Sequence, residues 1–353
     1  MSKYWSETVK NIEPYVPGEQ PKDKKYIKLN TNESPYPPSP KVIEAIKAAA
    51  GDSLRLYPDP NCDELKETIA NYYSLRKDQV FVGNGSDEVL AFAFMAFFNK
   101  GRKVFFPDIT YSFYPVYAEL FGLDYEAIPL DEDFNITLDR FNDENGGIII
   151  SNPKSPTAQA LPLKDVEAII KNNMDKVVMV DEAYIDFGGE SVVKLIDTYP
   201  NLLVIQTLSK SRCLAGLRVG FAMGHKDLIE GLERVKNSFN SYTLDRLAIA
   251  GAIEAFKDEA YFQETLKKII TTRERVSKAM KELGFRVLDS KANFLFASHG
   301  DISAKVLFQE LRERGVLVRY FNKPRIDNFL RITIGTDEEM DSLIKAVKEI
   351  LKV

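Results

Sequence analysis

Residues 201–224 read NLLVIQTLSKSRCLAGLRVGFAMG. Two apolar runs in this stretch, 202–205 and 217–223, are rich in branched side chains and predict buried strands on either side of a short turn. Lys210 stands at the end of the first strand. Long cations are rarely found there without a partner or a task, and burial favours the neutral amine, which attacks carbonyl carbon. The alternative interpretation is a surface lysine whose charged end reaches water.

The elements before this stretch alternate between strands and helices. Short apolar runs predict strands at 103–106, 124–128, 147–151 and 176–180, and helical spacing predicts helices between them at 112–121 and 163–173. Such alternation predicts an α/β fold with a mostly parallel central sheet and helices on both faces. Ligands bind a sheet of this kind in the crevice at the carboxyl ends of its strands.

Three segments are expected along the chain. Residues 1–39 are punctuated by proline and show little periodicity, which predicts an extended N-terminal arm lying over another part of the protein. Residues 40–275 are expected to form a large α/β domain. A long charged helix over 258–283 leads to a small α+β C-terminal domain, 276–353, with strands predicted at 285–288, 293–296, 316–320 and 329–334.

The composition is that of an ordinary soluble globular protein, with 44% hydrophobic residues, 28% charged residues and a formal net charge of -5. No long basic block is present, so neither nucleic acid nor a membrane is expected as a partner. The two cysteines and two histidines form no cluster with metal-ligand spacing, so no metal site is predicted. The first 30 residues lack the apolar core of a signal peptide, and the run 89–98 is too short to span a bilayer, which predicts a cytoplasmic location.

Polar residues follow several of the predicted strands. GNGSDE, at 83–88, places two glycines and Ser86 between a strand and a helix N-terminus, which suits an anion site or a plain capped turn. Asp181 ends another strand, where it could bind a cation, fix a protonated ring nitrogen or cap the next turn. Asn152 precedes a proline, which holds it out of helical geometry with its amide toward the crevice. The chain has no GxxxxGK[ST] sequence, which argues against an ATPase phosphate loop.

These residues are expected to meet in one crevice, because the carboxyl ends of parallel strands share one edge of the sheet. A lysine nucleophile, an aspartate, an anion-binding helix end, and Ser209 and Arg218 near the lysine match the needs of a pyridoxal 5'-phosphate enzyme. The lysine would bond the cofactor's aldehyde, the aspartate would keep the pyridine nitrogen protonated, and the helix end would bind the phosphate.

Motifs spread over nearly the whole chain point to one family. They are PYVPGE, LNTNESPYPPS, RLYPDP, GNGSDE, TYSFY, DEAYIDF, TLSKSRCLAGLRVGF and LRITIG. With them the chain resembles fold type I, class II pyridoxal-phosphate-dependent aminotransferases, and among these the histidinol-phosphate aminotransferase family. The resemblance implies transamination between L-glutamate/2-oxoglutarate and L-histidinol phosphate/imidazole acetol phosphate, a step of histidine biosynthesis. An aromatic or broad-specificity aminotransferase, a threonine-phosphate decarboxylase and a non-catalytic relative without cofactor remain alternatives.

The resemblance also implies roles for single residues at the cofactor. Lys210 is the catalytic lysine that forms the Schiff base, and Asp181 is the partner of the pyridine nitrogen. Tyr184 and Asn152 hold the ring oxygen, while Tyr111 stacks on the ring. The residues implied around the phosphate are Gly85, Ser86, Asp87, Ser209 and Arg218, joined by Tyr57 from the partner subunit. A homodimer with shared active sites follows from that last role.

Substrate recognition is implied in the same way. Arg331, in LRITIG, matches the family's arginine for the amino-acid carboxylate, and Arg319, in VLVRYF, the one associated with the substrate phosphate. Tyr15 lies nearby in the arm, and Asn152 is shared with the cofactor. Guanidinium groups bind both kinds of anion through paired hydrogen bonds. From the residues alone, both arginines could instead be cross-strand charge partners.

Two segments depart from the family pattern. Residues 152–158 read NPKSPTA where the family commonly has NPNNPTG, so Lys154, Ser155 and Ala158 replace turn residues. After the lysine the family usually has an aromatic and glycine pair, whereas this chain has Arg212 and Cys213. The first change leaves the asparagine in place, and the second adds a charge and a thiol near the lysine.

Overall fold

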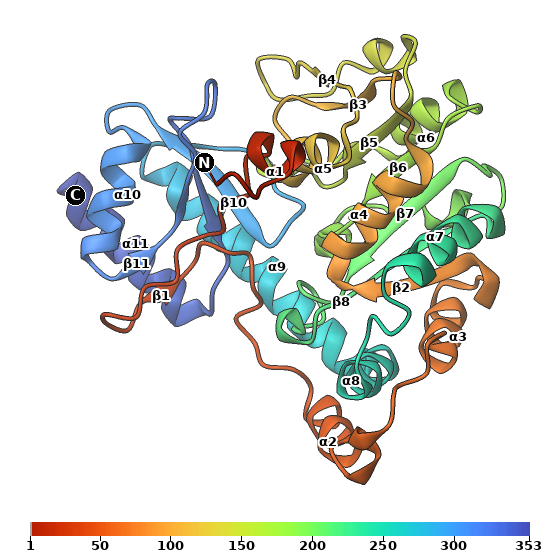
Figure 1. The fold of residues 1–353 in the computed structure, drawn as a ribbon. Coiled ribbons are helices and arrows are strands. Elements are labelled where there is room, and N and C mark those ends of the chain that lie inside the picture. Colours follow the sequence, from red (N-terminus) through yellow and green to blue (C-terminus); the bar gives the residue numbers. More distant parts are fainter. Residues whose placement is uncertain (1) are drawn as a thin grey trace.

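The computed structural model describes residues 2–353, and a seven-stranded sheet forms the centre of its larger lobe (Figure 1). The strands lie in the order β2-β8-β7-β6-β5-β3-β4, and all are parallel except β8, which is antiparallel to both neighbours. Their bounds are Val80–Asn84 (β2), Val104–Pro107 (β3), Tyr125–Ile128 (β4), Gly147–Ser151 (β5), Val178–Asp181 (β6), Leu202–Thr207 (β7) and Val219–Gly224 (β8). The predicted α/β fold with a mostly parallel sheet is confirmed.

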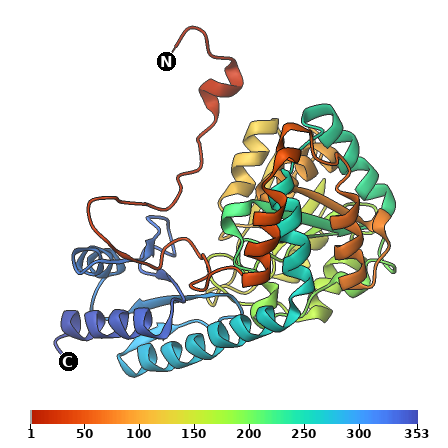
Figure 2. The ribbon, with the colours of Figure 1, turned by 90° about the horizontal axis from the view of Figure 1, so that it is seen from below.

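A second sheet of four antiparallel strands has the order β12-β13-β10-β9. It consists of β9 (Phe285–Val287), β10 (Phe294–His299), β12 (Arg319–Tyr320) and β13 (Leu330–Thr333), and it packs with α10 (Ala304–Glu313) and α11 (Asp337–Leu351). The long helix α9 (Glu259–Glu282) connects the two halves of the molecule (Figure 2). It runs unbroken through residue 275, and the domain boundary placed there remains a prediction.

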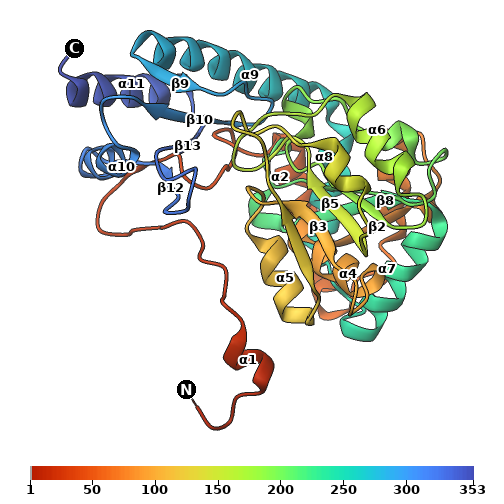
Figure 3. The same ribbon diagram turned by 90° about the horizontal axis from the view of Figure 1, so that it is seen from above.

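Helices cover both faces of the large sheet (Figure 3). On one face lie α2 (Pro40–Ala49), α3 (Asp63–Tyr73), α6 (Leu163–Asn172) and α8 (Arg246–Lys257), and on the other lie α4 (Gly85–Phe97), α5 (Phe113–Phe121) and α7 (Lys226–Phe239). Successive strand side chains point to opposite faces, so Ile148 and Ile150 join the first core and Ile149 joins the second. Because both faces are covered, β5 and β7 are buried throughout and contain the continuous apolar runs 148–150 and 202–205.

The N-terminal arm is anchored through a strand. It contains a short helix, α1 (Glu7–Asn11), and then β1 (Ile27–Lys28), which pairs in parallel with β11 (Val316–Leu317). The single strand predicted over 316–320 is therefore wrong: β11 pairs with the arm, whereas β12 pairs with β13 in the small sheet. The sequence shows no break there because the choice between two sheets is made by distant pairing partners. Within residues 2–353 we find no helix long and apolar enough to cross a membrane.

Candidate active site

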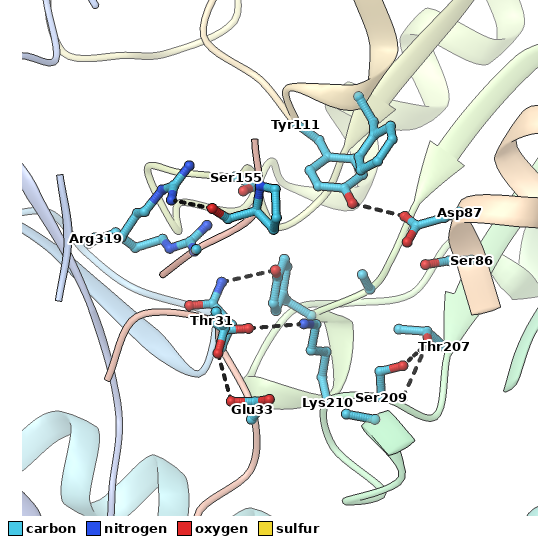
Figure 4. Close-up of a pocket in the computed structure, with 18 of the residues that line it drawn as sticks. Thr31, Glu33, Ser86, Asp87, Tyr111, Ser155, Thr207, Ser209, Lys210 and Arg319 are labelled. Atoms are coloured by element: carbon cyan, nitrogen blue, oxygen red, sulfur yellow. Dashed lines mark hydrogen bonds between the residues drawn. The ribbon is translucent and has the colours of Figure 1, made fainter. Parts of the chain in front are cut away.

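A cavity of about 460 Å³ lies where β6 and β7 end, and it receives residues from both sheets and from the arm (Figure 4). Most of the residues that the sequence proposed for the site line this cavity: Tyr15, Ser86, Asp87, Tyr111, Asp181, Tyr184, Ser209, Lys210, Arg218, Arg319 and Arg331. The expected convergence of strand-end side chains on one crevice is thus seen in the structure, although their individual roles remain predictions.

Lys210 projects into the cavity from the loop that follows β7. Its amine makes only a long hydrogen bond, 3.5 Å, to the backbone oxygen of Thr31. The same nitrogen lies 5.8 Å from the centre of the Tyr184 ring. No carboxylate forms an ion pair with it among the described residues. A lysine held in a cavity with so few partners has its amine available for chemistry.

Asp181 is the last residue of β6, and it is buried. Burial raises the pKa of its carboxyl to about 6, although the Tyr114 hydroxyl and the backbone N–H of Ala183 lower it by donating hydrogen bonds at 2.7 Å and 3.1 Å. Burial of a carboxylate with incomplete compensation is unfavourable. A protonated nitrogen placed beside Asp181 would remove that penalty.

The start of α4 forms the anion-binding side of the cavity. The helix begins directly after β2, at Gly85, whose φ of +77° lies in the left-handed region. A Cβ atom at this position would lie 2.4 Å from a guanidinium nitrogen of Arg218, so a larger residue would displace the arginine from its position at the helix end. Free N–H groups of the first turn, the Ser209 hydroxyl and the Arg218 guanidinium together suit a phosphate.

Gly220, in β8, packs closely against the start of α4. A Cβ atom there would lie 2.2 Å from the Ser86 nitrogen and 2.3 Å from the Gly85 carbonyl carbon. Both are backbone atoms, so we expect Gly220→Ala to destabilise the protein by about 3 kcal/mol in urea denaturation. Gly216→Ala is the matched control, since no atom lies within 4 Å of its added Cβ. Equal stability of the two variants would contradict the described approach of β8 to α4.

Aromatic side chains close another side. Burial and the Asp87 carboxylate raise the pKa of Tyr111, so its hydroxyl stays protonated and donates to Asp87 at 2.8 Å. Tyr15, from the arm, stacks on Phe113 with ring centres 4.3 Å apart. The arm therefore lines part of the cavity. Thr31 and Glu33, two other residues of the arm, also lie at the cavity (Figure 4).

Arg319 and Arg331 are directly opposite each other on β12 and β13. Like charges in that position repel, so the alternative that each pairs with an acidic residue across the strand does not hold. Arg319 donates to backbone oxygens of Val16 and Pro17, at 3.1 Å and 3.3 Å. Arg331 donates to the Asn30 oxygen at 3.0 Å, while its buried Nε has no partner among the described residues. Two adjacent guanidinium groups with unused donors suit an anionic ligand.

Three of the proposed site residues do not line the cavity. Gly85 lies behind it, against Arg218. Asn152 is buried, and its amide pairs with the backbone of Leu161: its Oδ1 accepts from the Leu161 N–H at 2.8 Å and its Nδ2 donates to the Leu161 oxygen at 3.4 Å, while its contact with the cofactor remains a prediction. That pairing satisfies backbone groups that would otherwise be buried without partners. Tyr57 is 77% exposed and stacks on Tyr242, away from the cavity of its own chain.

Both segments that depart from the family pattern keep a left-handed residue where glycine was replaced. Ala158 has a φ of 67° and Cys213 a φ of 60°. The Lys154 amine donates to the Phe134 backbone oxygen, and burial lowers the pKa of this lysine to about 8. The thiol of Cys213 lies 3.1 Å from the Ser34 hydroxyl. Neither replacement projects a charge into the cavity.

The sequence interpretation missed several residues of this site. Tyr114 holds Asp181, Asn32 donates to the Tyr184 hydroxyl at 3.0 Å, and Thr207 donates to the Ser209 hydroxyl at 2.9 Å. Tyr114 lies three residues after Tyr111 at the start of a helix, a spacing that places both on one face and could have revealed it. Nothing in the local pattern around Asn32 indicated its contact with a residue 152 positions away.

The chain belongs to the aminotransferase class I and II family, whose model matches residues 24–347. Among curated relatives, it is 65% identical over 349 residues to the histidinol-phosphate aminotransferase of Clostridium acetobutylicum, covering 99% of each chain. It is 61% identical over 351 residues to the histidinol-phosphate aminotransferase of Clostridium beijerinckii, covering 99% of this chain and 98% of that one. The resemblance inferred from the motifs is confirmed.

A solved structure agrees at the level of the fold. The histidinol-phosphate aminotransferase of Sinorhizobium meliloti, in complex with pyridoxal-5'-phosphate, superposes with a TM-score of 0.90 at 24% identity, covering 100% of this chain and 98% of that one. Its low identity limits this likeness to the architecture.

The cavity of this chain fits pyridoxal phosphate on its own chemistry. It offers the Arg218 guanidinium beside the first turn of α4, a buried carboxylate that forms no ion pair among the described residues, and a lysine amine. Those donors match a phosphate, a protonated ring nitrogen and an aldehyde, respectively. Within residues 2–353, no three His, Cys, Asp or Glu side chains gather in a way that could hold a metal ion.

Proposed function

We propose that this chain transfers an amino group between L-glutamate/2-oxoglutarate and L-histidinol phosphate/imidazole acetol phosphate with pyridoxal 5'-phosphate as cofactor, as a step of histidine biosynthesis. The observation that carries the proposal is a cavity containing Lys210, Asp181 and a pair of adjacent arginines, in a chain 65% identical to a histidinol-phosphate aminotransferase. We also propose that it acts in the cytoplasm.

The residues divide the work as follows. When bound, pyridoxal phosphate supplies an electron-withdrawing ring that stabilises negative charge on the substrate α carbon. Lys210 holds the cofactor and then, through Nζ, moves the proton that leaves that carbon. The Asp181 carboxylate keeps a proton on the ring nitrogen, and its own position is fixed by Tyr114. Ser209, Arg218 and the first turn of α4 bind the phosphate of the cofactor.

The absorption spectrum of the purified protein tests this function. We expect a visible band from bound cofactor that is lost when histidinol phosphate is added and returns with 2-oxoglutarate. Steady-state assays with histidinol phosphate, phenylalanine and threonine phosphate then separate the proposed activity from the alternatives. A colourless protein, or turnover with threonine phosphate alone, would exclude the proposal.

Arg319 and Arg331 are expected to divide the two substrate anions. Arg331→Met should raise the KM for glutamate by about 10- to 100-fold, the value of one or two charge-assisted hydrogen bonds. Arg319→Met should raise the KM for histidinol phosphate by a similar factor and that for glutamate much less. Initial rates with each substrate varied in turn measure the two effects. Equal losses for both substrates in both variants would mean that the arginines act together on one anion.

We further propose a homodimer in which Tyr57 completes the active site of the partner subunit. Tyr57 is held by Arg246, which donates to its backbone oxygen at 2.5 Å, and large apolar side chains around it are exposed: Leu54 at 55%, Leu56 at 51% and Phe239 at 72%. Exposed apolar groups of this size favour an interface.

Hybrid dimers test that proposal. We expect Tyr57→Ala to weaken cofactor binding in the homodimer. Mixing it with an inactive Lys210→Ala chain should restore one intact site per hybrid dimer, because Lys210 of the first chain then meets an unchanged Tyr57. Absorbance titration and activity of the mixture, after exchange of subunits, report the result. Activity that only adds, with no recovery, would place Tyr57 in its own chain's site or outside any site.

A further inference from the structure

The loop that carries Lys210 contains a second cation, Arg212, which does not enter the cavity. Its side chain is buried, with 7% of the residue exposed. The guanidinium carbon lies 4.0 Å, 4.3 Å and 4.8 Å from the ring centres of Phe262, Phe256 and Tyr72. These rings come from α9, α8 and α3, so one side chain joins three helices to the lysine loop.

Few polar partners accompany this burial. Arg212 donates to the Ala255 backbone oxygen at 2.6 Å, and its nearest carboxylate, on Glu259, is 4.0 Å away. Aromatic faces attract a cation, and the attraction is strongest where water is excluded. The three rings therefore stabilise the buried guanidinium in place of water. Because they do so only when Arg212 lies between them, they hold the loop in one position.

The residue between the two cations fixes the other side of the loop. The Ser211 hydroxyl donates to Asp186, in the short 3-10 turn Ile185–Phe187 after β6. Burial raises the pKa of Asp186, while the Ser211 hydrogen bond and the Arg212 charge lower it. Because Asp181 ends β6 and Tyr184 lies in the segment after it, this bond ties the lysine loop to the stretch that carries both of these proposed cofactor residues.

The base of the loop is closed as well. The Leu214 N–H donates to the Leu208 oxygen at 3.0 Å, and Cys213 takes the left-handed conformation that turns the chain back. Lys210 thus stands on a loop fastened at its base, at Ser211 and at Arg212. Its own amine has only the long bond to Thr31, so the backbone supplies the orientation that hydrogen bonds to the amine do not.

We propose that Arg212 is a positioning residue for Lys210: its aromatic cage, together with the Ser211–Asp186 bond, holds the lysine loop where Nζ can reach the cofactor and the substrate. This inference rests on the proposed function of Lys210. It goes beyond that function by assigning a task to Ser211 and Arg212, neither of which lines the cavity.

The test compares variants of Arg212 with a variant that is destabilised elsewhere. Arg212→Met keeps a long apolar stem and removes the guanidinium, whereas Arg212→Lys keeps the charge but not the planar group. Asn201→Ala is the control, because its amide donates to the backbone oxygens of Ile170, Asn173 and Lys176 at the opposite end of β7. Cofactor-free proteins are mixed with pyridoxal phosphate, and the appearance of the visible band is followed by stopped flow beside urea denaturation.

For Arg212→Met we expect cofactor uptake and kcat each to fall at least about 10-fold, with the KM for glutamate changed less than about threefold, since the substrate arginines lie on another sheet. For Arg212→Lys, the rate of cofactor uptake and kcat should both be intermediate between those of Arg212→Met and those of the unchanged protein. Asn201→Ala should lose stability yet take up cofactor at the original rate. Wild-type uptake by Arg212→Met, or equal slowing in Asn201→Ala, would overturn the proposal.

Two further results keep the test decisive. If Arg212→Met does not fold, Phe262→Leu removes one ring of the cage and Ser211→Ala removes the hydroxyl, and each is expected to slow uptake by a smaller factor. Unchanged uptake in both would equally overturn the proposal. Failure of the unchanged protein to take up cofactor would instead refute the proposed function itself.

Discussion

Lys210→Ala is expected to lower transamination by about four orders of magnitude or more, because one side chain both bonds the cofactor and transfers the substrate proton. The structure offers no substitute for it at the cavity: of the described residues that line it, Lys210 is the sole lysine. Single-turnover kinetics with histidinol phosphate measure the loss. Borohydride reduction followed by mass spectrometry should attach the cofactor to the unchanged protein at Lys210 and leave the variant unlabelled.

Lys154→Met is the matched control for this experiment. Lys154 is more deeply buried than Lys210, and burial lowers its pKa to about 8, so it is the other candidate for a reactive lysine. Its amine, however, donates a hydrogen bond to the backbone oxygen of Phe134. We therefore expect the control to lose stability while retaining turnover within about tenfold. Turnover above about one hundredth of the original rate in Lys210→Ala would contradict the assigned roles.

Asp181→Asn is expected to have opposite effects on stability and on catalysis: it should stabilise the cofactor-free protein and lower its activity. In the cofactor-free protein the pKa of this carboxyl is raised from 3.8 to about 6. Between these values the folded state binds more protons than the unfolded chain, so stability falls as the pH rises through this interval. An amide carries no charge, so Asp181→Asn should stabilise the cofactor-free protein at pH 8 by about 1 to 3 kcal/mol, and the gain should vanish below about pH 4.

The same change should damage catalysis. Without the Asp181 carboxylate, the ring nitrogen loses the acceptor proposed to keep it protonated, and we expect kcat to fall by about 1000-fold and cofactor affinity by about 10- to 100-fold. Urea denaturation from pH 4 to pH 8 measures the change in stability, and cofactor titration measures the change in affinity. Tyr114→Phe is the control: it keeps the charge but removes the 2.7 Å hydrogen bond, so it should destabilise the protein most at high pH. A stability gain for Asp181→Asn that is equal at all pH values would refute the electrostatic explanation.

Much of the fold could be predicted because its signals are local. Continuous apolar runs such as Ile148 to Ile150 mark strands covered on both faces, and these runs alternate with amphipathic helices. The parallel arrangement then places strand-end residues at one edge, which is why Lys210 and Asp181 were correctly expected in one crevice. The break between β11 and β12 was missed because the two strands pair with segments that lie far away in the chain.

The site was predicted less completely than the fold. Asn152 follows β5, and its amide also pairs with the Leu161 backbone, a contact that the sequence did not indicate and that satisfies buried polar groups. The arginines of β12 and β13 were identified one at a time. Their direct opposition, which makes an anionic ligand the better explanation, depends on strand register and appears only in the folded sheet.

The stretch 201–224 shows both sides of this division. By itself, the sequence determined that two buried strands flank a turn carrying Lys210, because burial on both faces requires an uninterrupted apolar pattern. Tertiary structure alone decided what holds that turn. The rings around Arg212 come from Tyr72, Phe256 and Phe262, on three separate helices, and the acceptor of Ser211 is Asp186 on another loop. Such contacts join residues with no fixed spacing along the chain, so only their packing in three dimensions could bring them together.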